Sequence, residues 1–222
     1  MSKFVFRCLS LVFGSLLFAV GVVLAINANI GYAPWEVFHV GLSLTTGLSL
    51  GLVSIIAGSV IVVIVTLCGE TIGFGTIISM ILTGTFIDLL MLLNIIPKSD
   101  KPAIGIFMLV AGLFVSSIGS YFYMNSAFGV GPRDNLMVVL KRKTKLPIGV
   151  CRSSVELFVM LIGWLLGGMV WIGTAISVVA MGFCIQLTFA AFRFDPTKVN
   201  HETFGRTYRA LAEIRSARKR RR

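Results

Sequence analysis

Four polar or charged side chains lie inside apolar runs of this chain and are its best candidates for chemistry. They are Asp88, Gln186, Arg152 and Glu156. A charge in the middle of a bilayer costs about 2.5–3.5 kcal/mol on insertion scales, so such residues usually face the interior of a bundle and serve a pathway. We expect Asp88 to bind a substrate or to carry a proton. The alternative is a structural hydrogen bond between helices.

Asp88 and Gln186 occupy equivalent places in two similar halves of the chain, which predicts a shared central position. Arg152 and Glu156 are four residues apart and therefore share one helix face. We expect an ion pair between them. The alternative is that Glu156 lines a path and Arg152 adjusts its charge.

Two polar segments repeat one order of residues, "NANIGYAPWEVF" from Asn27 and "NSAFGVGPRDNL" from Asn125. Their shared positions are Gly31, Pro34, Trp35, Glu36 and Gly129, Pro132, Arg133, Asp134. Proline suits the first position of a helix, and an acid two residues later can accept free N–H groups at the positive helix end. We expect helix capping here. We also expect Asn27 and Asn125 to cap carbonyls at the ends of equivalent spans, with ligation of a substrate as the alternative. The alternative is that both helix starts frame a site for a cationic or zwitterionic solute.

The sequence gives no basis for an enzyme, a metal site or a cofactor. "GETIGFG" lacks the lysine of a phosphate-binding loop, and no HExxH pattern occurs. The four cysteines form no CxxC pair, and the two histidines, His39 and His201, are far apart. We therefore predict neither catalysis nor a bound metal or cofactor.

The elements that position these residues must be membrane helices. Hydrophobic residues make up 56% and charged residues 13% of the chain, whereas soluble domains average about 25% charged residues. Six apolar runs each approach the ~20 residues that cross a bilayer as a helix. These runs are 8–26, 50–68, 76–96, 103–124, 149–168 and 170–192. Two further helices, Pro34 to Gly47 and Pro132 to Lys145, are too short to span and would be interfacial or re-entrant.

The chain contains an internal repeat with an offset of 98 residues. Gly14 aligns with Gly112 (112 − 14 = 98), and 22 of the 79 pairs from Leu11 to Leu89 are identical. Each copy holds three predicted spans, so the second must enter from the opposite face. We predict an all-α fold of six transmembrane helices in two inverted repeats. The predicted units are repeat 1–97, repeat 98–193 and a basic tail, 194–222.

The basic residues predict the orientation of the chain. With both termini in the cytoplasm, only Lys98 and Lys101 of the 20 lysines and arginines fall outside, which leaves 20 − 2 = 18 inside. Trp35 would then be an outer interfacial anchor, and Arg133 would belong to the basic inner face. We expect this face to contact anionic lipid head groups, and we do not expect nucleic acid as a partner.

"GYAPWE" and "GVGPRD", in a six-span chain with a basic tail, resemble the YczE/YyaS/YitT family of bacterial membrane proteins. The resemblance covers about residues 5 to 192. It is closer to the YczE-like members, because no soluble ligand-binding domain follows the last span. The resemblance implies a bacterial inner-membrane location, but it implies no substrate and no catalytic residues.

Two functions remain open from the sequence. The first is a small-solute transporter or exporter, proton-coupled through Asp88 and Glu156. The second is an accessory or regulatory membrane protein that binds a partner at its basic cytoplasmic face. The identity of the solute and homo-oligomerisation stay open in both.

Cysteines placed at Thr46 and at Thr144 test the inverted topology, in a chain whose four native cysteines are replaced. The two threonines end equivalent segments that we predict on opposite faces of the membrane. An impermeant maleimide should therefore label Thr46→Cys in intact cells and Thr144→Cys in inside-out vesicles. Labelling of both cysteines from one side contradicts the inverted arrangement.

Overall fold

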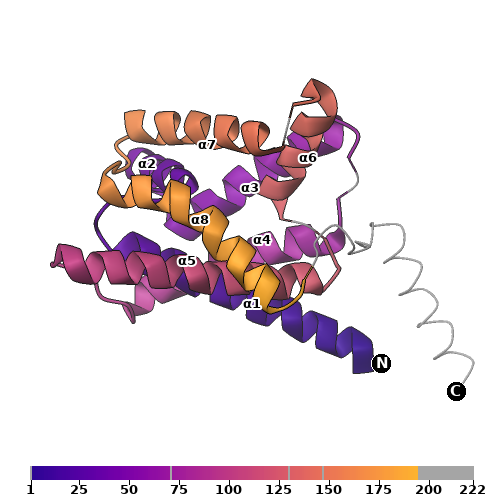
Figure 1. Cartoon of the computed structure of the whole chain (residues 1–222), viewed down its shortest axis with the longest axis horizontal. Coiled ribbons are helices and arrows are strands. Elements are labelled where there is room, and N and C mark those ends of the chain that lie inside the picture. The colour runs from indigo at the N-terminus through magenta and orange to yellow at the C-terminus, as the bar shows by residue number, and fades with distance from the viewer. Residues whose placement is uncertain (1, 71, 130, 147, 195–222) are drawn as a thin grey trace, which may run out of the picture.

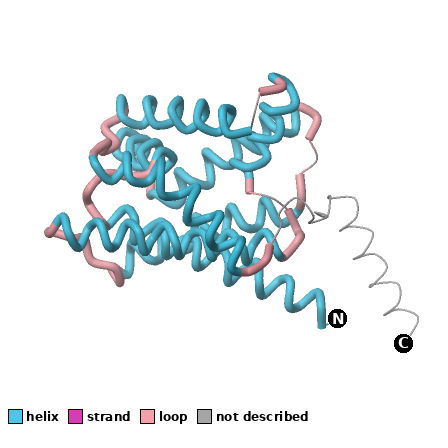
Figure 2. Tube along the Cα trace, in the orientation of Figure 1, coloured by secondary structure: helices cyan, strands magenta, loops and turns pink. Residues whose placement is uncertain are grey.

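A computed structural model of the chain describes residues 2–70, 72–129, 131–146 and 148–194. Within these residues every regular element is an α-helix, and short connections join consecutive helices (Figure 2). The helices are α1 Ser2–Asn27, α2 Pro34–Thr46, α3 Leu50–Leu67, α4 Phe74–Leu93, α5 Pro102–Asn125, α6 Pro132–Thr144, α7 Ile148–Leu165 and α8 Ile172–Ala191 (Figure 1). The all-α prediction is confirmed. The predicted basic tail lies outside the described residues from position 195 onward.

Five of the described helices are long and apolar enough to cross a membrane. They are α1, α3, α4, α5 and α8, which match five of the six predicted spans. Helix α7 corresponds to the predicted run 149–168 and contains the charged residues Arg152 and Glu156; it is not among these five. The described part of the chain is therefore helical, with five candidate membrane spans.

The two short helices begin at the predicted prolines. Pro34 and Pro132 each occupy the first turn of their helix, where a missing N–H costs no hydrogen bond. Both helices end in a left-handed residue, Gly47 at φ 72° and Lys145 at φ 57°. In this conformation the N–H groups of Gly47 and Lys145 donate to the carbonyl oxygens of Ser43 and Lys141, and the helix ends there. At 13 residues each, α2 and α6 are too short to span a bilayer.

Helices α1 and α5 pack antiparallel through two glycine contacts. A Cβ added to Gly14 would lie 2.9 Å from the carbonyl oxygen of Gly119, and one added to Gly112 would lie 2.7 Å from that of Gly21. No side chain fits at such distances, so the two backbones are in direct contact. Figure 1 shows the two helices running side by side.

Two backbone hydrogen bonds connect the predicted halves. In each, the loop before the short helix of one half accepts a hydrogen bond from the start of a long helix in the other half. The N–H of Gly173, in α8, donates to the carbonyl oxygen of Ile30 at 2.7 Å, and the N–H of Gly75, in α4, donates to that of Phe128 at 3.0 Å. The donors are 98 residues apart, and so are the acceptors. These bonds fix the loops that precede α2 and α6, and thereby the direction in which both short helices begin.

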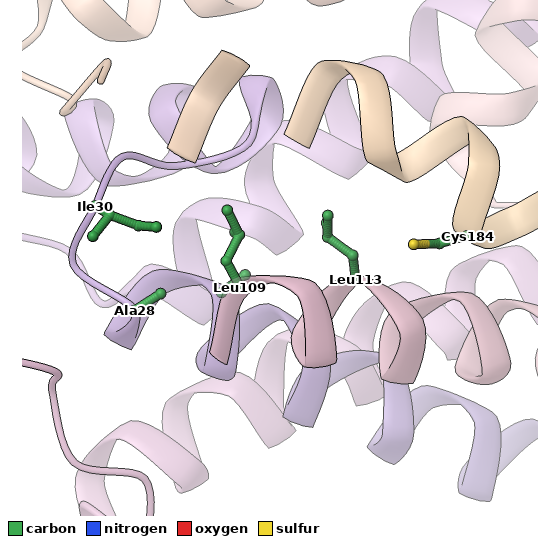
Figure 3. Packing of buried hydrophobic residues seen from close by; sticks show 6 residues of the cluster. Ala28, Ile30, Leu109, Leu113 and Cys184 are labelled. Atoms are coloured by element: carbon green, nitrogen blue, oxygen red, sulfur yellow. The ribbon is translucent and has the colours of Figure 1, made fainter. Parts of the chain in front are cut away.

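A small apolar core lies between α5, α8 and the loop after α1. In Figure 3, Leu109 and Leu113 point from α5 toward α8, and Cys184 of α8 lies on the same side. Leu109 is fully buried, as is Ala28 in the loop. This core holds α8 against α5 and keeps the loop before α2 in place.

The substitution Gly112→Ala tests the contact between α1 and α5. The added methyl would lie 2.7 Å from the Gly21 carbonyl oxygen and 2.9 Å from the Ala25 nitrogen. We expect overpacking to lower the free energy of unfolding by about 1–3 kcal/mol, measured as thermal unfolding in detergent. Gly182→Ala is the matched control, because a Cβ at Gly182 meets nothing within 4 Å. Equal losses in both variants would contradict the contact.

Candidate functional site

A buried ion pair links the two short helices near their starts. Oε1 of Glu36, in α2, lies 3.5 Å from Nη1 of Arg133, in α6. The Glu36 side chain is 9% exposed and that of Arg133 is 29% exposed. The structure thus brings together two predicted site residues from the two equivalent motifs. They are 97 positions apart in sequence.

Trp35 forms the apolar wall of this site. Its indole is buried and packs in one core with Ile61, Val139 and Val159. The Arg133 guanidinium lies over the ring, 4.7 Å from its centroid, in a cation–π contact. The prediction of an exposed interfacial anchor at Trp35 is therefore wrong: the ring is only 7% exposed.

His39 is a buried member of the site that the sequence reasoning missed. It is 3% exposed and lies beside the rings of Trp35 and Phe38. Burial, reinforced by the Arg133 charge, lowers the pKa of His39 well below its usual value, so the imidazole is neutral at pH 7. Its spacing offered a signal, because His39 lies three residues after Glu36 on one helix face.

A second ion pair adds to the site from α7. Arg152 Nε donates to Glu156 Oε1 at 2.9 Å, and the two side chains are 42% and 21% exposed. The predicted ion pair is confirmed. Val155 and Val159 of the same helix pack in one core with Trp35, which places α7 beside the first ion pair. We call Glu36, His39, Arg133, Arg152 and Glu156 the charged cluster.

The charged cluster changes the acidity of Glu36, whose helix lies outside the five candidate spans. Burial raises the pKa of the Glu36 carboxyl above its usual value, and the Glu156 charge adds to this. The Arg133 guanidinium and the Glu36 backbone N–H oppose the rise. An acid of this kind changes charge more readily near neutral pH than an exposed glutamate does.

Asp88, in α4, contacts the start of α3. Ser49, the residue before α3, donates its hydroxyl to Asp88 Oδ2 at 2.5 Å, and the Gly51 N–H donates to Oδ1 at 2.7 Å. The interhelical hydrogen bond that we named as the alternative is thus present. Gln186, at the equivalent position of α8, is exposed. The shared central position of these two residues stays a prediction.

The remaining predicted residues have structural surroundings. Asn27 donates from Nδ2 to the carbonyl oxygen of Ile96 at 2.6 Å, which ties the end of α1 to the connection after α4 rather than capping its own helix. Asn125 is exposed at the end of α5. Gly31, at φ 109°, packs against the start of α8, and Gly129 packs against Thr76 in α4. Asp134 lies in α6, but its side chain lies outside the described part.

A cavity of 410 Å³ opens elsewhere, beside the starts of α5 and α8. Its lining includes Asn29, Ser99, Lys101 and Trp171. These residues belong to the loops that we predict on the outer face. The cavity is separate from the charged cluster, whose residues do not line it.

The apolar helices and the buried charges define an integral membrane protein, and comparison with known proteins places it in a family. Residues 5–189 match a family described as of unknown function, DUF6198, and the chain belongs to this family. It is 30% identical to the uncharacterized membrane protein YczE of Bacillus subtilis, over 79% of this chain and 81% of the relative. The predicted YczE-like membership is therefore confirmed.

Two further relatives carry no assigned function. An uncharacterized protein of Haemophilus influenzae is 29% identical over 79% of this chain and 80% of its own length. The uncharacterized protein YyaS of Bacillus subtilis is 26% identical over 78% of this chain and 88% of its own length. No solved structure matches the chain.

A double-mutant cycle on Glu36→Gln and Arg133→Gln tests the buried ion pair. Each single change leaves a charge without its partner, so the double variant should lose less stability than the two single losses together. We expect a coupling of about 0.5–3 kcal/mol in thermal unfolding. Glu70 and Arg142, 2.8 Å apart with side chains 22% and 54% exposed, form a more exposed comparison pair. Its coupling should stay below about 1 kcal/mol, and equal couplings contradict the prediction.

Proposed function

We propose that this chain is a transporter or exporter of a small solute, built as two inverted repeats of three spans. The observation that carries the proposal is the charged cluster at the starts of α2 and α6. Buried charges lower the stability of an apolar bundle unless they are paired, and membrane proteins keep them mainly where a substrate or an ion passes. Equivalent short helices that meet at charged starts are also typical of secondary transporters.

The contacts between the halves support the inverted repeat. The contact of Gly14 with Gly119 becomes that of Gly112 with Gly21 when each residue number is shifted by 98 in opposite directions. The hydrogen bond from Gly173 to Ile30 corresponds in the same way to that from Gly75 to Phe128. A pseudo-two-fold axis between antiparallel α1 and α5 relates such contacts. Parallel repeats would have placed these two helices parallel.

Helix α7 is proposed as the sixth span. It follows α6, whose Arg142 pairs with Glu70 just after α3. It ends near Met169, whose carbonyl oxygen accepts a hydrogen bond from the Tyr32 N–H after α1. Helix α7 therefore runs from the end of the bundle where α3 stops to the end where α1 stops. The paired charges of Arg152 and Glu156 reduce the cost of placing this helix in lipid.

We propose that both termini lie in the cytoplasm and that the membrane is the bacterial inner membrane. With this orientation the loops after α1 and α4 form the outer end of the bundle, and α6 with its basic last turn lies at the inner end. The first of these is the predicted outer end of the bundle, and the second is the predicted inner end. Anionic lipid is the proposed neighbour of the basic inner end.

The chemistry of the cluster favours a cationic or zwitterionic solute. The cluster contains two ion pairs, each of an acid and an arginine, so a solute with an amine and a carboxylate finds a partner for each charge. The raised pKa of Glu36 makes it a third candidate for proton coupling, beside Asp88 and Glu156. The role remains non-enzymatic in this proposal, because salt bridges rather than a nucleophile and its base form the cluster.

The alternative function is an accessory or regulatory protein that binds a partner through its basic tail. The tail is rich in arginine, ending in "RSARKRRR", and lies outside the described residues. Deletion after Arg206 separates the two functions. A transporter keeps its activity without these residues, whereas a tail-dependent accessory protein loses its effect.

Comparison of metabolites in cells with and without the protein identifies the solute, and vesicle uptake then tests the site. We expect Glu36→Gln to lower uptake about tenfold or more, because a lost charged hydrogen bond is worth about 1.5–3 kcal/mol. Glu70→Gln, which alters an acid outside the cluster, should keep normal uptake. The proposal is wrong if no solute differs, or if both variants transport normally.

A further inference from the structure

The two equivalent helices α4 and α8 differ in what covers them. Gly84 of α4 faces α3: a Cβ there would meet the side chain of Ile55 and lie 2.7 Å from the Gly51 carbonyl oxygen. Gly182 is its equivalent in α8 (84 + 98 = 182), and a Cβ there meets nothing within 4 Å. One glycine of the pair is packed and the other is open.

The difference continues along one face of each helix. On α4, Gly84 is buried, and Met80 and Asp88, one turn away on either side, are half-buried. The equivalent face of α8 is exposed at Gly182 and Gln186, and Val178 is 53% exposed. We call Val178, Gly182 and Gln186 the open stripe.

The neighbouring face shows that the difference is local. Ile81 and Leu89 of α4 are 46% and 47% exposed, and their equivalents in α8, Val179 and Leu187, are 78% and 46% exposed. This face is open in both helices, as expected for contact with lipid. The two helices differ only on the face that packs on α3 in α4. The equivalent face of α8 has no described helix packed on it.

The helix that corresponds to α3 is α7, and its matching face is uncovered too. Ile55 and Ser59 of α3 are half-buried, whereas the equivalent Ser153 is exposed and Leu157 is 54% exposed. Both surfaces of the missing contact are therefore present and open. The starts of α3 and α7 lie at opposite ends of the bundle.

We propose that the structure is one of two states, and that the two halves exchange their packing between them. In this state α3 closes on α4 at the predicted outer end, and α7 stands away from α8 at the predicted inner end. In the other state α7 covers the open stripe and α3 leaves α4. The inference rests on the inverted repeat of the proposed function, and it assigns the gates of that transporter.

Asp88 holds the outer gate closed through hydrogen bonds; we call this side chain the latch. Its two oxygens accept hydrogen bonds from the Ser49 hydroxyl and the Gly51 N–H, so one carboxylate joins α4 to the first turn of α3. At the inner gate the equivalent of Asp88 is the neutral Gln186, and that of Ser49 is Pro147, which has neither a hydroxyl nor an N–H. The contact between α3 and α4 is therefore stronger than the equivalent contact between α7 and α8 would be. This difference favours the state in which α3 is closed on α4.

Labelling of Ser153→Cys from the inner face tests the exchange, in a chain without other cysteines and without added solute. Gly84→Ala places a methyl inside the closed outer gate, so it should favour the other state and slow labelling about fivefold or more. Gly182→Ala places the same methyl on the open stripe, where only the other state has no room for it. Its labelling should be as fast as in the otherwise unmodified chain, or faster.

Asp88→Asn gives a second test that adds no volume and therefore does not depend on folding of Gly84→Ala. It weakens the latch and should slow labelling in the same direction as Gly84→Ala. The inference is overturned if Gly182→Ala slows labelling as much as Gly84→Ala does. Equal labelling rates in Asp88→Asn, Gly182→Ala and the unmodified chain also overturn the inference. So does a complete lack of Ser153→Cys labelling from the inner face. The predicted shifts without any transported solute support the gates and overturn only the transport proposal.

Discussion

Helices α1 and α5 approach so closely that glycine is required at both crossing points. At Gly14 and Gly112 an added methyl would meet the backbone of the facing helix within 3 Å. Lipid offers no hydrophobic driving force between apolar helices, so van der Waals contact of this kind is what holds a membrane bundle together. The other helices are arranged around this pair: α4 packs on α1, and α8 packs on α5. The loops that follow α1 and α5 then lead directly into α2 and α6.

The charged cluster depends on that arrangement. Glu36 and Arg133 come from different halves, and they meet because the loops before α2 and α6 are held by backbone hydrogen bonds to α8 and α4. An isolated charge in an apolar surrounding would be expensive, but each charge here has a partner of opposite sign. The aromatic ring of Trp35 covers the pair and limits its contact with solvent. Stability alone does not require such a cluster, since apolar side chains of similar size would pack as well or better.

Local signals in the sequence predicted the helices and their starts. Proline and an acid mark the beginning of α2, and long apolar runs mark the spans, because both signals act within a few residues. The burial of Trp35 and His39 was not predictable in this way. A tryptophan near a helix start suits the lipid interface as well as a core, and only the position of Arg133 on a distant segment decides between them. The position of Asp88 also depends on a tertiary partner, the first turn of α3.

The repeat in the sequence predicts symmetry, yet a transporter with two symmetric gates would not work. If both gates closed, the charged cluster would be sealed, and if both opened, the bundle would contain a continuous pore. Two similar halves must therefore hold different conformations at any moment. Small differences between equivalent residues decide which half closes first. Asp88 accepts two hydrogen bonds at the start of α3, whereas its equivalent Gln186 is neutral and exposed, and Pro147, the equivalent of Ser49, has no hydroxyl to donate. In the proposed transporter, the departure from the repeat at these positions is thus part of the mechanism.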